Sequence, residues 1–229
     1  SYQLPPLGNA LKEIHFPPNQ QAIVNARKRL AFDEIFLLQI GVLQQKRSWK
    51  SATASVFSIS EEELLVWQKN LPYQLTNAQQ KVLSEIRADL LTGQPMNRLL
   101  QGDVGSGKTV VAALGMAVVM KNSAQAALMA PTSILAEQHY RSLTKLLTTS
   151  ANGDPVLMAD EIRLLIGDTK NAEKEEIRTG VENGSIRLII GTHALLEDPL
   201  VFQNLQMVVI DEQHRFGVEQ RAILRAKGN

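Results

Sequence analysis

The chain has 229 residues, of which 44% are hydrophobic and 21% are charged, and its formal net charge is +1. It is apolar enough for a packed core, and its near-zero net charge does not by itself indicate a nucleic-acid partner. The lack of cysteine excludes disulfides and thiolate zinc sites and fits a cytoplasmic protein. No apolar run approaches the roughly 20 residues that span a bilayer, so no membrane partner is expected.

Residues 1–74 are predicted to form a helical segment ahead of a separate domain over residues 75–229. Apolar residues recur at helical spacing from Asn19 to Lys46, after a Pro-Pro breaker, which predicts one long helix that could contain a break. Residues 49–59 are polar and Ser-rich, which favours a loop. Ser60 and the three glutamates after it predict a capped short helix that ends before Pro72.

From residue 75 onward, strand-like and helix-like segments alternate. Helices are predicted over residues 77–90, 108–120, 134–147 and 172–179, and a loop over residues 151–160. Strands are predicted over residues 98–101, 126–130, 162–166, 187–191 and 207–210. This alternation is typical of βαβ units, so we predict an α/β fold with a mostly parallel sheet and helices on both faces.

The segment from Gly102 to Thr109 (GDVGSGKT) fits the P-loop pattern and lies between a predicted strand and a predicted helix. Small residues in such a loop let backbone N–H groups approach phosphates closely; here they are Gly102, Gly105, Ser106 and Gly107. Lys108 is predicted to reach the β- and γ-phosphates, and the Thr109 hydroxyl to bind Mg²⁺. The sequence therefore predicts a nucleoside triphosphate site.

A pair of carboxylates follows the apolar run at residues 206–210. Asp211 is predicted to hold the Mg²⁺, usually through water, and Glu212 to orient and deprotonate the attacking water. Ligands of open α/β sheets bind at the carboxyl ends of strands, where this pair falls. A lone Asp-Glu would instead favour an acidic strand end at the surface, but a P-loop upstream makes the catalytic interpretation the better one.

These motifs occur in an order that resembles the first motor domain of superfamily 2 helicases. The P-loop, the segments 130–139 and 191–195, and above all the run from Asp211 to Arg221 (DEQHRFGVEQR) resemble the RecG family of branched-DNA helicases. Residues 11–17 and 26–43 are similar to the segment that precedes the motor in that family. The resemblance implies a RecA-like P-loop NTPase fold and an ATP-dependent helicase that acts on forks and Holliday junctions in recombination and repair.

The resemblance also implies roles for individual residues. Gln79 would recognise the adenine edge, although Thr76 and Gln79 also form a capping-box pattern at the start of a helix. Thr132 and Thr192 would contact DNA phosphates, with ordinary helix N-caps as the alternative. Gln213 and His214 would sense the γ-phosphate and relay its state toward the DNA. The remaining histidines are predicted to be structural: His15, His139 and His193.

The cofactors implied are ATP and Mg²⁺, and the implied partner is branched DNA. The chain begins without Met and stops soon after the carboxylate pair, so we expect it to be an excised piece. In the family, a wedge domain binds the junction, and a second motor domain supplies arginines to the ATP site. We expect neither the wedge domain nor the second motor domain to be part of this piece, so the isolated piece is expected to be nearly inactive.

Three alternatives remain open. A transcription–repair coupling translocase has similar motor motifs, but Gln213 and the continuation over residues 217–221 favour the RecG family. An ABC-type transporter ATPase or a nucleotide kinase would not explain the Asp-Glu-Gln-His run. A nucleotide-dependent binding module without hydrolysis is disfavoured by Glu212.

Overall fold

The computed structural model describes residues 3–149, 155–197, 199–217 and 227. The chain divides into two compact units, Ser1–Ala54 and Ser55–Asn229. None of the helices within the described ranges has the length and apolar character needed to cross a membrane.

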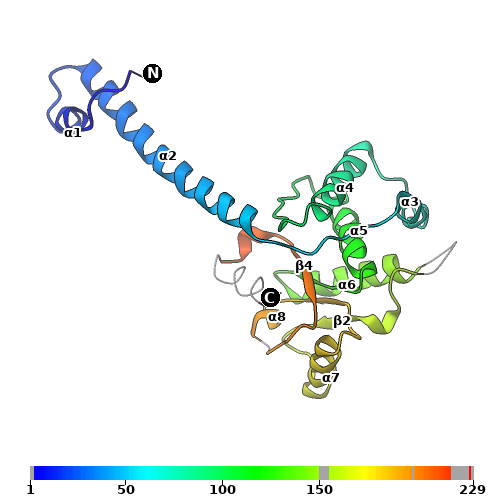
Figure 1. Cartoon of the computed structure of the whole chain (residues 1–229). Helices are drawn as coiled ribbons and strands as arrows, with labels where there is room; N and C mark the ends of the chain where they lie inside the picture. The colour runs from blue at the N-terminus through cyan, green and yellow to red at the C-terminus, as the bar shows by residue number, and fades with distance from the viewer. Residues whose placement is uncertain (1–2, 150–154, 198, 218–226, 228–229) are drawn as a thin grey trace. The chain divides into compact units, whose positions relative to one another are not determined.

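The first unit consists of two helices, α1 (Leu7–His15) and α2 (Gln20–Ser51), which pack against each other (Figure 1). The long helix is confirmed without a break, and it extends to Ser51, so the predicted loop begins later than residue 49. No proline interrupts α2, and a single interior glycine, Gly41, costs only about 1 kcal/mol relative to alanine. The buried side chains of this unit are small: Ala10, Ala22 and Ala26.

The second unit is built on a four-stranded sheet in the order β2-β3-β1-β4, and every pairing between its strands is parallel. The strands are β1 (Gln125–Met129), β2 (Ile162–Leu165), β3 (Leu188–Gly191) and β4 (Leu205–Ile210). All four were predicted, with ends that differ by at most two residues. The central pair is the most completely buried, because each residue of β1 and β3 is covered on both faces.

Helices cover both faces of this sheet, as predicted. Ala126 and Leu128 of β1 belong to one core cluster, whereas Ala127 and Met129 belong to another, so successive side chains point to opposite faces. The first cluster includes buried residues of α4 (Asn77–Leu90), α5 (Lys108–Lys121) and α6 (Ser133–Thr148). The second includes those of α7 (Asn171–Glu182) and the short α8 (Ala194–Glu197). Figure 1 shows α7 on the side of the sheet away from α4 and α5.

The start of the second unit precedes the predicted boundary at residue 75. Phe57, Ile59 and two side chains of α3 (Glu61–Lys69), Leu64 and Trp67, are buried in the same cluster as α4 and α5. The predicted capping box of α3 is present, with Ser60 accepting from the Glu63 backbone N–H. The start of the motor domain at residue 75 stays a prediction, and residue 75 lies inside the compact unit Ser55–Asn229.

One predicted strand is absent. Residues 98–101 form no strand, and Leu99 is 68% exposed, so this prediction is wrong. The apolar pair Leu99-Leu100 has the local pattern of a buried strand, but Arg98 forms ion pairs with α4. The segment thus joins α4 by side-chain contacts and no strand by backbone pairing, and β4 and β2 are the two edges of the described sheet.

A buried polar side chain joins the amino-terminal edge of the sheet to its connections. Gln125 is 3% exposed, and its amide nitrogen donates to the carbonyls of Val181 and Ile186 at 2.8 and 2.7 Å. Its amide oxygen accepts from the Asn204 N–H at 2.8 Å. Gln125 is the first residue of β1. Its side chain thus provides hydrogen-bond partners for the backbone that leaves α7 and for the backbone that enters β4.

Candidate nucleotide site

The P-loop and the carboxylate pair lie at the same edge of the sheet. Helix α5 starts at Lys108, packs against β1 and β4, and is joined to β1 by residues 122–124 alone. So short a link requires α5 to run antiparallel to β1, which places its N-terminus at the carboxyl ends of the strands. Asp211 follows β4 directly at that edge. This is where open α/β sheets bind their ligands.

The backbone of the P-loop has the conformation that its glycines permit. Gly105 and Gly107 have φ values of +79° and +78°, a left-handed conformation that other residues rarely adopt. Gly107 is also the N-cap of α5, and a Cβ there would lie 2.3 Å from the Gln79 side chain. A Cβ on Gly102 would lie 2.7 Å from the Ser106 hydroxyl. The loop is thus a narrow backbone cradle at a helix N-terminus, which suits phosphate groups.

Lys108 folds back over the loop in this structure. Its ammonium donates to the carbonyls of Gly102 and Asp103, at 2.8 Å each. An ammonium has three donors, so one remains for another acceptor. Thr109 is half-buried in the first turn of α5.

Gln79 connects α4 to the P-loop. The predicted capping box is confirmed: the Thr76 hydroxyl accepts from the Gln79 N–H, and the Gln79 amide oxygen accepts from the Thr76 N–H at 2.8 Å. The other end of the amide donates to the carbonyl of Ser106 at 2.8 Å. Both polar ends of Gln79 are therefore engaged within the protein, and recognition of adenine stays a prediction.

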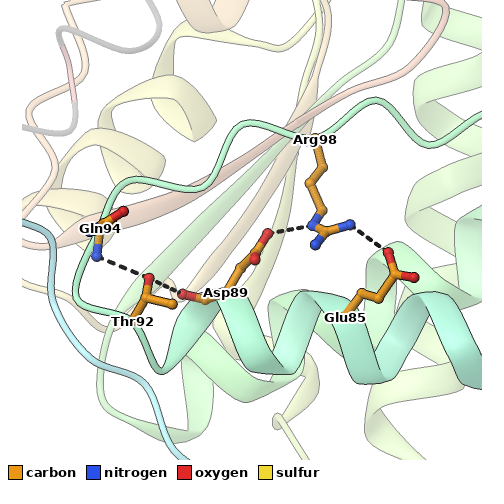
Figure 2. A network of polar contacts seen from close by, with 5 residues as sticks. All are labelled: Glu85, Asp89, Thr92, Gln94 and Arg98. Atoms are coloured by element: carbon orange, nitrogen blue, oxygen red, sulfur yellow. Dashed lines mark hydrogen bonds and ion pairs between the residues drawn. The ribbon is translucent and has the colours of Figure 1, made fainter. Parts of the chain in front are cut away.

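A second connection joins the other end of α4 to the chain that leads into the P-loop. Figure 2 shows the Arg98 guanidinium between Asp89 and Glu85. The Arg98 Nη1 lies 2.7 Å from the Glu85 Oε2. The hydrogen bond with Asp89 is the main cause that raises the pKa of Arg98 above its ordinary value. Thr92 closes the turn after α4 through its hydroxyl, which donates to the Asp89 carbonyl and accepts from the Gln94 N–H.

The carboxylate pair has an unusual backbone. Asp211 donates its N–H to the Met129 carbonyl at 2.9 Å, and one of its carboxylate oxygens accepts from the Glu212 N–H at 2.9 Å. Glu212 has φ +47° and ψ +50°, a left-handed conformation that is strained for a residue with a side chain. Such strain concentrates at functional sites. The Glu212 carboxylate pairs with Arg215 at 2.9 Å.

His139 contacts Asp211, although the sequence predicted only a structural role. Its Nε2 lies 2.8 Å from the Asp211 Oδ2, and its side chain is 14% exposed. The contact joins residues 72 positions apart, so no local pattern could reveal it. One signal was available: His139 lies on the face of α6 that includes the buried residues Ala136 and Leu143. A histidine on a buried helix face needs a polar partner.

The structure places the other predicted residues near the same sheet edge. Thr132 caps α6 by accepting from the Leu135 N–H, and Thr192 follows β3 with only 9% of its surface exposed. The exposed residues Gln213 and His214 form a 3₁₀ turn after Glu212. Residues 218–221 of the long motif lie outside the described residues.

The oxygen ligands at this edge fit a magnesium ion. Mg²⁺ is usually held by one or two protein oxygens together with phosphates and water, which matches a hydroxyl from Thr109 and a carboxylate from Asp211. In the described part of the chain, no group of three or more His, Asp or Glu side chains forms a metal cage of its own. The site thus suits a metal that arrives with a phosphate ligand.

Comparison with known proteins gives a consistent result. The family model for DEAD/DEAH box helicases matches residues 76–227. The ATP-dependent DNA helicase RecG of Synechocystis is 47% identical over 229 residues, which is all of this chain and 27% of that protein. RecG of Bacillus subtilis is 42% identical over the whole chain, which covers 32% of that protein. The chain thus spans about a third or less of these relatives.

Solved structures agree with the sequence comparison. The chain is similar to a RecG structure bound to a three-way DNA junction, with a TM-score of 0.80 and 41% identity, over 94% of this chain and 28% of that one. It also matches the UvsW helicase of bacteriophage T4 with a TM-score of 0.55 at 14% identity, over 76% of this chain and 58% of that one. The second likeness shows the fold alone.

Proposed function

Because the chain belongs to the DEAD/DEAH box helicase family, we propose that it is the first motor domain of a RecG-type, ATP-dependent DNA helicase. The observation that carries the proposal is a complete P-loop at the carboxyl edge of a parallel sheet, beside the end of β4 that bears Asp211 and Glu212. Similarity to RecG proteins over the whole chain supports this particular helicase type.

ATP is the proposed nucleotide, and residues 102–109 are its proposed phosphate site. The N–H groups of the loop and the N-terminus of α5 would bind the phosphates. The remaining donor of the Lys108 ammonium would bind one phosphate oxygen, and reaching both the β- and γ-phosphates would require it to exchange one of its bonds to the loop carbonyls. Thr109 and Asp211 would hold Mg²⁺, which when bound neutralises phosphate charge.

Glu212 is the proposed base for the attacking water. Its carboxylate pairs with Arg215 through Oε2 here, which leaves Oε1 for the attacking water. We propose that Gln213 and His214, which follow directly in an exposed turn, respond to the γ-phosphate. The strained backbone of Glu212 supports a specialised role for this turn.

Branched DNA is the proposed partner, with Thr132 and Thr192 as proposed phosphate contacts. The similar RecG structure was solved with a three-way DNA junction, which supports this choice. Thr132 lies at the N-terminus of α6, a favourable place for a phosphate. The burial of Thr192 would require a small local movement before its hydroxyl met a phosphate. A double-stranded DNA translocase of the transcription–repair coupling type is the alternative.

Hydrolysis is proposed to require a second motor domain and branch recognition a wedge domain, both on the same parent chain, with the cytoplasm as the site of action. An arginine supplied from an opposing domain contributes about 10³ to 10⁵ in turnover in well-studied NTPases. We therefore expect the present chain to bind nucleotide but to hydrolyse it very slowly, with little stimulation by DNA.

The test combines binding and turnover. In calorimetry with ADP and Mg²⁺, Lys108→Ala should weaken binding to the present chain, because it removes the cation that faces the phosphates. Forked DNA should stimulate ATP hydrolysis by the parent protein and leave the present chain almost inactive. Equal nucleotide affinity in wild type and Lys108→Ala, or strong DNA-stimulated turnover by the present chain alone, would contradict the proposal.

A further inference from the structure

Asp211 is held by donors from two directions. Its Oδ1 accepts from the Glu212 N–H at 2.9 Å, and its Oδ2 lies 2.8 Å from the His139 Nε2. An ionised carboxylate can only accept hydrogen bonds, so we assign the donor role in this contact to the His139 Nε2–H. Each carboxylate oxygen keeps a further lone-pair direction for another partner. The two donors therefore fix the plane of the carboxylate and leave it able to bind a metal or a metal-bound water.

The helix that carries His139 is firmly seated. Ala136, Leu143 and Leu147 of α6 are at most 2% exposed, and they pack in the cluster on the α5 face of the sheet. The Asp211 backbone is equally fixed, because its N–H bonds to the Met129 carbonyl at the end of β1. The contact thus joins two rigid elements, which is how an outer residue orients a metal ligand effectively.

We propose that His139 is a positioning residue for the metal site: it holds the Asp211 carboxylate in the orientation that receives the Mg²⁺ accompanying the nucleotide. The inference rests on the proposed function, because it needs a nucleotide whose binding depends on Mg²⁺. His139 itself touches neither nucleotide nor metal. Partners that orient metal ligands typically contribute about 10- to 100-fold in metal affinity.

The experiment is a titration of Mg²⁺ against the binding of a fluorescent ADP analogue to the present chain. In His139→Ala, the half-saturating Mg²⁺ concentration should rise about tenfold. Affinity for the analogue measured in EDTA should not change, because the P-loop is intact. His139→Gln should remain close to wild type, since glutamine can place its amide nitrogen near the position of Nε2. The matched control is Thr144→Val, which removes a buried hydroxyl from the same helix without touching Asp211.

The outcomes separate the two proposals. If wild type does not bind the analogue, or binds it as well as Lys108→Ala does, the proposed function fails. If wild type binds normally but His139→Ala has an unchanged Mg²⁺ dependence, only the inference about His139 fails. An equal loss of affinity with and without Mg²⁺ would also overturn it, since that result indicates a general structural role.

A second pair of variants covers the case in which His139→Ala does not fold. Asparagine reaches the position of the other ring nitrogen, whereas glutamine reaches that of Nε2. His139→Asn should therefore raise the Mg²⁺ requirement while His139→Gln does not, and equal behaviour of the two would refute the proposal.

Discussion

Gln79 offers a direct test of how α4 supports the nucleotide site. Gln79→Ala removes two contacts: the half of the capping box that reaches the Thr76 N–H and the hydrogen bond to the Ser106 carbonyl. Loss of the cap should cost about 1 kcal/mol of stability. Loss of the bond to Ser106 should destabilise the ordered conformation of the P-loop by about 1 kcal/mol more. If nucleotide binds only that conformation, its affinity becomes about fivefold weaker.

Thr76→Ala is the matched control, because it removes the other half of the same capping box, and among the described residues the Thr76 hydroxyl bonds within that box and not to the P-loop. Chemical denaturation should show a loss of about 1 kcal/mol in Thr76→Ala and about 2 kcal/mol in Gln79→Ala, which also loses the bond to Ser106. Calorimetry should show weaker nucleotide binding only in Gln79→Ala. Equal weakening in Thr76→Ala would refute the direct link to the loop, since it would assign the effect to the helix start.

The same variant separates the two roles considered for Gln79. A contact with the P-loop backbone does not depend on the base, so Gln79→Ala should weaken ADP and GDP binding by the same factor. Recognition of the adenine edge would weaken ADP binding alone. A loss confined to ADP would therefore contradict our expectation and establish the adenine contact.

Two further predictions concern stability and chemistry. Gln125→Leu should lower the free energy of unfolding by about 3 kcal/mol in a urea titration, because the Ile186 carbonyl and Asn204 N–H lose their buried partner. Thr144→Val should be nearly neutral, since the buried Thr144 hydroxyl has no partner within the described residues. In the parent protein, Glu212→Gln should retain ATP binding and lose about 10² to 10⁴ in steady-state ATPase rate, and near-normal turnover would show that another group is the base.

The parts of the structure that the sequence predicted well are set by neighbours in the chain. The start of α4 follows from a capping box within four residues, and the observed helix has the predicted bounds. The P-loop conformation follows from Gly105 and Gly107, which alone permit the observed φ values. The buried strands are recognisable because a strand covered on both faces must be apolar throughout.

The parts that the sequence did not predict depend on distant partners. The segment at Arg98 has the pattern of a strand, but it pairs with no strand, and Arg98 forms ion pairs with Glu85 and Asp89 of α4 instead. The contact of His139 with Asp211 likewise requires the fold to bring together α6 and the end of β4. The polarity of a histidine on a buried helix face indicates that a partner exists without indicating which one.

These distant contacts have a common consequence for the site. Residues 98–101, which lead into the P-loop, are paired with no strand, so backbone hydrogen bonds do not fix the phosphate loop to the edge strand that ends at Asp211. Gln79 and Arg98 connect the phosphate half of the site to α4 instead, whereas the metal half is held by the bond of the Asp211 N–H to β1 and by the contact with His139 of α6. Both helices pack with α5 on one face of the sheet. The relative position of the two halves is therefore set by helix packing, so substitutions between these helices should alter nucleotide binding without touching the nucleotide.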